Sequence, residues 1–268
     1  MPNNTTRINE DSFELNGYTY TGTHTPDGQF ILTSSKDGAL NDRVTMQIGS
    51  DELTYETFDN IANKAANVNL ASAHPQNIQA LKVSDYITLA VEGSTVGTRA
   101  ASAPLVGSIG SVSYTGSAGY VVNHSISFTS SLTGSATGKT FTVSAPGGTA
   151  MTVLIAAIGA GFGGIGAAIW AAIAAAAGAG TGLLITSAFT TTIYGDLYTY
   201  SILGIADDGR RVTETGAQYV GQVQKNGALV PATLYTGAYP QFISKKDRGV
   251  AILFYMDFWT ETTINMNW

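Results

Sequence analysis

Residues 150–189 read AMTVLIAAIGAGFGGIGAAIWAAIAAAAGAGTGLLITSAF, and the interpretation of the whole chain depends on this stretch. It contains no charged residue, and between Arg99 and Asp196 the only charged side chain is that of Lys139. Alanine and glycine dominate its composition, and hydroxyl groups supply its polar side chains. So long an uncharged run has to be sheltered from water, either by lipid or by the rest of the protein.

The first interpretation of this stretch is insertion into a membrane. A spanning helix needs ~20 apolar residues to cross a hydrocarbon layer ~30 Å thick, and the stretch has about twice that length. It therefore predicts two spans or one re-entrant hairpin, with a turn at 159–164 or 178–182. Gly159 and Gly163 have the G-x-x-x-G spacing that lets helices pack closely in lipid, and Trp170 favours a nearby turn at the interface. The side chains expected to insert are Met151, Val153, Leu154, Ile155, Ile158, Phe162, Ile165, Ile169, Trp170, Ile173, Leu183, Leu184 and Ile185.

The second interpretation is a dinucleotide site. Residues 151–158 have the composition of a buried strand, and Gly159, Gly161 and Gly164 follow as a literal G-x-G-x-x-G before a helical run. This pattern resembles the fingerprint of flavin and nicotinamide enzymes, in which the pyrophosphate rests on a helix N-terminus. The acidic residue that should hold the ribose about 20 positions later is missing, because no Asp or Glu occurs before Asp196. We therefore predict no cofactor.

The third interpretation is a helix buried entirely in a protein core.

Composition limits the choice of function. The chain has 268 residues, enough for one large domain or two small ones with a complete core. Charged residues make up 12% of it and the net charge is −6, which disfavours nucleic acid as a partner because such binding needs a basic face. Cysteine is absent, which excludes disulfides, thiol nucleophiles and thiolate metal sites.

Residues 1–99 have the pattern of a β-rich body. Asp-Gly pairs at 27–28 and 37–38 lie between alternating apolar runs, which is typical of tight hairpin turns. Residues 51–71 combine acidic side chains in a first turn with apolar side chains on one face, and therefore predict an amphipathic helix. Residues 80–91 contain a strand that is apolar on both faces, which favours a central position in a sheet.

Residues 100–149 are rich in Ser, Thr and Gly. The runs 120–129 and 141–144 alternate apolar with small polar side chains around a Gly/Ser turn at 133–138, which predicts a β-hairpin. This is the pattern of an edge hairpin of a β-sandwich, and also of a membrane hairpin with ~10 residues per strand. In composition, over about 25 residues, it resembles the Ser/Thr-rich inserting hairpins of aerolysin-type toxins. The resemblance implies a second candidate for insertion, with its apolar face formed by Val122, Ile126, Phe128, Phe141 and Val143.

Residues 190–268 return to strand patterns. An Asn-Gly pair at 226–227 is a strong hairpin signal, and Pro231 marks an edge strand or a bulge. The strands predicted here are 190–205, 211–224, 228–235 and a strongly apolar core strand at 249–259. The fold class that follows is α+β and β-rich: an antiparallel sheet or sandwich body, with a hydrophobic helix or helical hairpin inserted at about 150–189.

Catalytic chemistry is sparse in this sequence. The three histidines share no metal-ligand spacing, no serine lies in a G-x-S-x-G motif, and no P-loop is present. We therefore predict neither a catalytic nor a metal site, and not an enzyme. Tyr194, Tyr198 and Tyr200 flank the uncharged stretch, where they suit a membrane interface, a sugar-binding surface or an ordinary sheet surface.

The function expected from these patterns is membrane activity. The chain is predicted to be a pore-forming protein of the toxin or cytolysin class, which shelters residues 151–187 in a soluble β-rich form and inserts them into a target membrane. A single hairpin cannot enclose an aqueous pore, so the expected partners are a lipid membrane and further copies of the chain; no glycan or protein receptor is identified. The alternative is a structural or carbohydrate- or receptor-binding subunit with a buried Ala/Gly helix, and third comes the dinucleotide-binding enzyme.

Two further expectations concern route and trigger. The start MPNNTTRINEDSFELNGY lacks the basic start and apolar core of a signal peptide. The protein is therefore expected to stay inside the cell, to leave by a leaderless route, or to be present here in its mature form, and the prediction is secretion or leaderless release followed by the target membrane. Acidic residues number 19 against 13 basic ones. Protonation of carboxylates near pH ~4–5 should therefore reduce repulsion from anionic lipid and strengthen vesicle binding.

Overall fold

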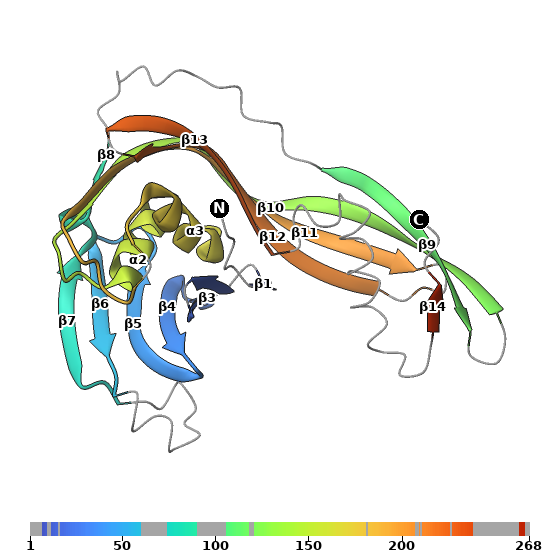
Figure 1. Cartoon of the computed structure of the whole chain (residues 1–268), viewed down its shortest axis with the longest axis horizontal. Coiled ribbons are helices and arrows are strands. Elements are labelled where there is room, and N and C mark those ends of the chain that lie inside the picture. Colours follow the sequence, from blue (N-terminus) through green and yellow to red (C-terminus); the bar gives the residue numbers. More distant parts are fainter. Residues whose placement is uncertain are drawn as a thin grey trace.

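Two antiparallel sheets enclose a layer of helices in the computed structural model of the chain (Figure 1). The layer consists of α2 (Met151–Gly161) and α3 (Ala167–Ala177). This architecture confirms a β-rich α+β fold with antiparallel sheets. The structure describes residues 7–9, 12–15, 17–59, 74–89, 106–117, 121–180, 182–206, 209, 211–225, 227–237 and 263–265.

The first sheet is a meander in which each strand pairs with the next one along the chain. The alternation of its side chains explains its position, because every second residue faces the helices. In β4 these inward residues are Phe30, Leu32 and Ser34, all buried. The strands are β1 (Arg7–Asn9), β2 (Ser12–Leu15), β3 (Tyr18–His24), β4 (Gln29–Lys36), β5 (Ala39–Gln47), β6 (Glu52–Thr57) and β7 (Asn77–Lys82).

The second sheet arches over the other side of the helices and continues well beyond them (Figure 1). Its strand order is β13-β12-β11-β10-β9-β14, and β8 also pairs with β10. A short 3-10 turn, η2 (Val83–Asp85), leads from β7 of the first sheet to β8 of the second. The strands are β8 (Ile87–Leu89), β9 (Gly107–Ser117), β10 (Val121–Ala145), β11 (Phe189–Ala206), β12 (Arg211–Lys225), β13 (Ala228–Gly237) and β14 (Thr263–Asn265).

Glycines shape the connection between the two helices. Gly163, Gly164 and Gly166 have positive φ angles of 71°, 83° and 70°, which other residues adopt only with strain. Gly178 ends α3 in the left-handed conformation, with a φ of 90°. The stretch 162–166 therefore turns tightly, and α3 returns alongside α2.

Two expectations for the N-terminal part are wrong. Residues 52–57 form strand β6 rather than the start of a helix, and most of the remaining predicted helix, from residue 60 to 71, lies outside the described residues. Leu53 and Tyr55 alternate with Thr54 and Glu56, and pairing with both β5 and β7 outweighs the helix signal of the acidic residues. The strand expected over 80–91 is divided by η2, and β7 lies at the end of the first sheet's strand order rather than in its centre.

The hairpin turn expected at 133–138 is also wrong. β10 runs without a turn from Val121 to Ala145, and its pairing with β11 shifts register between Leu132 and Gly134 and between Ala136 and Lys139. The Gly/Ser residues therefore lie at two irregularities in one long strand, where small residues are tolerated. The hairpin partner of β10 is β9, which pairs with residues 121–130.

Local turn signals are confirmed elsewhere. Asp37 and Gly38 have φ angles of 52° and 77° and connect β4 directly to β5. Lys225 of β12 pairs with Ala228 of β13, Gly227 has a φ of 79°, and Pro231 lies in β13, the strand at one end of the second sheet's order. The predicted strand at 249–259 lies outside the described residues.

Candidate functional site

The helix layer is the most unusual part of the molecule, because its helices are apolar on every side. Residues 151–159 of α2 are all buried, and Ile169, Trp170 and Ile173 of α3 have no exposed surface. A helix without a polar face is stable only where protein or lipid surrounds it. None of the described helices combines the length and the hydropathy that a membrane span requires.

The residues predicted to insert fall into two groups in the structure. Most of them are buried between the sheets, including Phe162 in the connection and Ile185 after α3. Ile165 and Leu183 are half-buried, and Leu184 is 49% exposed. The segment therefore forms a core layer except at its C-terminal end, where Leu184 reaches the surface beside Ala150.

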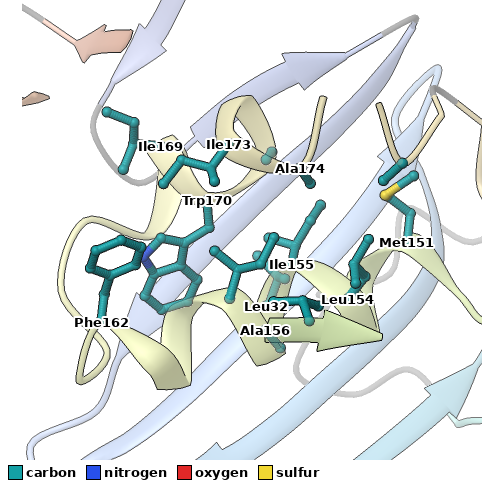
Figure 2. Packing of buried hydrophobic residues seen from close by; sticks show 14 of the residues in the cluster. Leu32, Met151, Leu154, Ile155, Ala156, Phe162, Ile169, Trp170, Ile173 and Ala174 are labelled. Carbon is teal, nitrogen blue, oxygen red and sulfur yellow. The ribbon is translucent and has the colours of Figure 1, made fainter. Parts of the chain in front are cut away.

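α2 and α3 pack closely where a glycine meets an aromatic ring. A Cβ on Gly159 would lie 2.2 Å from the ring of Trp170, so only glycine fits there. The Trp170 Nε1–H donates a hydrogen bond of 2.6 Å to the carbonyl of Ile165, which satisfies its one polar atom. Figure 2 shows the Trp170 ring lying between the two helices, beside Phe162. Gly163, the second glycine of the G-x-x-x-G spacing, is exposed in the turn after α2.

Aromatic contacts join the helix layer to both sheets. The ring of Trp170 meets that of Phe30 in β4 edge-on, at 4.6 Å between centroids. On the other side, Phe162 meets Phe141 of β10 at 5.2 Å and Tyr219 of β12 at 5.9 Å. Such edge-to-face pairs add to the stabilisation from burial. The sheets are therefore held together through the helices.

The glycine pattern does not have the structural context of a dinucleotide fingerprint. Residues 151–158 form a helix rather than the expected strand, which corrects that part of the interpretation. Gly159 and Gly161 lie in the last turn of α2, and a Cβ on Gly161 would lie 2.6 Å from the Phe141 ring. These glycines face side chains, whereas a pyrophosphate site needs their backbone to line an open loop before a helix.

Beneath α2, the first sheet contains a buried carboxyl that sequence analysis missed. Asp42 of β5 is 1% exposed and accepts hydrogen bonds from Ser34 Oγ and, at 3.3 Å, from the Tyr55 hydroxyl. Burial raises the pKa of Asp42 to about 6, although these hydrogen bonds act to lower it. The available signal was its position in phase with the inward residues Val44 and Met46 of the same strand.

The second candidate for insertion, β10, runs along the second sheet. Phe128, Phe141 and Val143 are buried, and the side chains of Val122 and Ile126 lie outside the described part of the structure.

Of the three tyrosines near the uncharged stretch, Tyr198 and Tyr200 are buried and Tyr194 is half-buried. Among the described residues, no cluster of acidic or histidine side chains could hold a metal ion.

No family model, curated protein or solved structure matches this chain.

Proposed function

We propose that the protein is a membrane-active, pore-forming protein that inserts as a homo-oligomer. The observation that carries this proposal is a helical segment without a solvent-facing polar side, held as a layer between two sheets (Figure 1). The hydrophobic gain from burial is similar in a protein core and in lipid, so a modest change in the body can shift the segment from one to the other.

Two elements are candidates for the part that enters the membrane. Each helix has 11 residues, about 16 Å at a rise of ~1.5 Å per residue, so only the whole stretch 150–189 has the length for crossing. The hairpin of β9 and β10 has strands of 11 and 25 residues, and a membrane strand needs ~9–11. The part of the hairpin in which β9 pairs with residues 121–130 of β10 extends away from the helices (Figure 1).

Engineered disulfides separate these two routes, and the chain has no cysteine of its own. Ser131 of β10 lies opposite Ser201 of β11, and Ser111 of β9 lies opposite Ser127 of β10. Opposite residues in antiparallel strands lie ~4.5–5.5 Å apart at Cα, which a disulfide can bridge. The pair Ser131→Cys/Ser201→Cys ties the hairpin to the body, whereas Ser111→Cys/Ser127→Cys ties only its own two strands together.

The measurement is dye release from liposomes, with size-exclusion chromatography in the presence and absence of lipid. We expect the oxidised 131–201 variant to lose release and to regain it on reduction, and the 111–127 variant to release dye in both states. If both oxidised variants remain active, the hairpin is not the inserting element and the stretch 150–189 takes that role. If the unmodified protein neither releases dye nor assembles on lipid, the proposal fails, and the helices form the core of a structural or binding subunit.

A further inference from the structure

Asp42 lies in the middle of a row of polar side chains that crosses the first sheet under α2. The row runs Tyr20, Ser34, Asp42 and Thr57 over four neighbouring strands, β3 to β6. Tyr20, Ser34 and Asp42 are each at most 1% exposed. A carboxyl in such a place is surrounded by protein on both the sheet side and the helix side.

α2 presents one polar side chain, and this side chain faces Asp42. Thr152 is fully buried, and its hydroxyl makes no hydrogen bond of ordinary geometry, yet it lies near enough to Asp42 to lower the pKa of that carboxyl. The Tyr20 hydroxyl is likewise buried without a hydrogen bond. The Thr152 O–H can donate to the Asp42 carboxylate, and this interaction opposes the effect of burial on the pKa of Asp42.

No cation compensates Asp42 in the described part of the molecule. α2 and α3 contain no ionisable residue, and the inward residues of β4 and β5 other than Asp42 are apolar or hydroxyl-bearing. The ionisable groups facing it are the phenols of Tyr20 on β3 and Tyr55 on β6, both with pKa values raised by burial. Arg43 points to the opposite face of β5, where its guanidinium pairs with Glu56 at 2.5 Å.

We propose that Asp42, together with the hydroxyls of Ser34, Tyr55 and Thr152, forms a proton-operated latch between the first sheet and α2. The protonated carboxyl carries no buried charge, while the Thr152 hydroxyl can accept from it or donate to the carboxylate. The ionised carboxylate only accepts hydrogen bonds and places an uncompensated charge beneath an apolar helix. The latch is therefore closed when Asp42 is protonated and weakened when it is ionised.

The direction of the pH effect follows from the pKa. The value rises from 3.8 in the unfolded chain to about 6 in the fold, so the folded state holds the proton more tightly. The stabilisation is present in full below pH ~4 and is lost as the pH rises through about 6. Acid therefore closes the latch.

The decisive variant is Asp42→Asn, which keeps the shape and removes the titration. The free energy of unfolding is measured by urea denaturation from pH 4 to pH 8. From pH 4 to pH 8 the unfolding equilibrium constant of the unmodified protein should rise by roughly fiftyfold more than that of Asp42→Asn. The amide can change the free energy of unfolding by the same amount at every pH. Such a constant change does not affect the test, because only the pH dependence of the two proteins is compared. Parallel curves for the two proteins would overturn the latch.

Two further measurements keep the test decisive if Asp42→Asn folds poorly. Thr152→Val removes the helix hydroxyl while keeping the volume, and should move the pH-dependent step to higher pH because an interaction that lowers the pKa of Asp42 is lost. Hydrogen exchange of the α2 amides, corrected for intrinsic rates, should accelerate from pH 5 to pH 7.5 in the unmodified protein. As a control, Asp51→Asn removes an exposed carboxyl whose pKa is lowered by hydrogen bonds from Ser84, and should leave this step in place.

Control of the helix layer's release by the latch rests on the proposed function. The experiments distinguish failure of the latch from failure of the proposed function. If unfolding and hydrogen exchange show the pH-dependent step but the protein releases no dye, the latch is supported and the pore-forming proposal is rejected. Dye release by the unmodified protein, with no pH step that depends on Asp42, supports pore formation and rejects the latch.

Discussion

Gly159 shows how a single residue decides the fit of the two helices. Glycine normally costs a helix ~1 kcal/mol relative to alanine. Here its missing Cβ makes room for the ring of Trp170, whose atoms lie 2.2 Å from where a Cβ would stand. The low helix propensity of glycine is therefore offset by the close packing that it allows. Glycine is common where two backbones, or a backbone and a ring, approach each other.

We expect Gly159→Ala to destabilise the protein despite its better helix propensity. The added methyl overlaps the ring of Trp170, which has no exposed surface, and overpacking of this kind costs ~1–3 kcal/mol. The urea midpoint should therefore fall. Gly182→Ala is the matched control, because the nearest atom to its Cβ is 3.7 Å away and its φ is not positive. A midpoint for Gly159→Ala equal to or above that of the unmodified protein would contradict the packing argument.

A second close approach at the residue scale occurs between β11 and β12. Gly195 and Gly221 lie opposite each other, and a Cβ on Gly221 would lie 2.1 Å from the carbonyl oxygen of Tyr194. The hydroxyl of Tyr219 reaches the same place, 2.8 Å from that carbonyl. The tyrosine therefore covers the paired glycines and compensates for their lack of side-chain contacts.

At the scale of elements, the helices α2 and α3 differ from ordinary surface helices because they have no solvent face. A charge in α3, as in Ile173→Lys, places an ammonium where no surface is exposed. Such a change unfolds the protein before it can report on a membrane, since an unpaired buried charge costs several kcal/mol. The informative positions are those of the same segment that already lie at the surface.

Leu184→Lys is the charge substitution that tests insertion of this segment. Leu184 is 49% exposed, so the variant should fold with an unchanged urea midpoint. If residues 150–189 enter lipid, dye release should fall at least tenfold, because a lysine within the bilayer costs ~2.5 kcal/mol or more. Ile78→Lys, at a position 61% exposed on β7, is the matched control outside the segment. Unchanged release by Leu184→Lys would leave the β9–β10 hairpin as the inserting element.

At the scale of the whole molecule, two pH effects act in opposite directions. The net charge of −6 becomes less negative on acidification, which favours docking on anionic lipid. Protonation of Asp42 strengthens the contact between the first sheet and α2, which hinders release of the helices. Binding and permeabilisation are therefore expected to separate when the pH is changed.

We expect co-flotation with anionic vesicles to be stronger at pH ~5 than at pH ~7.5 and, if residues 150–189 are the inserting element, dye release per bound molecule to be weaker at pH ~5. Both quantities are measured on the same samples, with neutral phosphatidylcholine vesicles as the control for charge. Asp42→Asn should remove the pH dependence of release per bound molecule and leave that of binding. Binding that falls on acidification would reject the charge argument, and release per bound molecule that rises would reject the role of Asp42.

Local chemistry in the sequence determined the features that depend on neighbouring residues. The Asp-Gly turn at 37–38 and the hairpin that joins β12 to β13 could be placed because positive φ angles favour Asp-Gly and Asn-Gly pairs wherever they occur. The β-rich class followed from period-two alternation, and the need to shelter residues 150–189 followed from their lack of charge.

Only the tertiary structure decided which partner each segment meets. Residues 52–57 carry helix signals but pair as β6, and residues 133–138 carry turn signals but continue β10, because β11 offers them a ladder more than 50 positions along the chain. Asp42 became a buried carboxyl only when α2 was placed over β5. Pairing and burial between distant segments outweigh local propensities of about 1 kcal/mol per residue, and a single sequence shows the propensities without showing the partners.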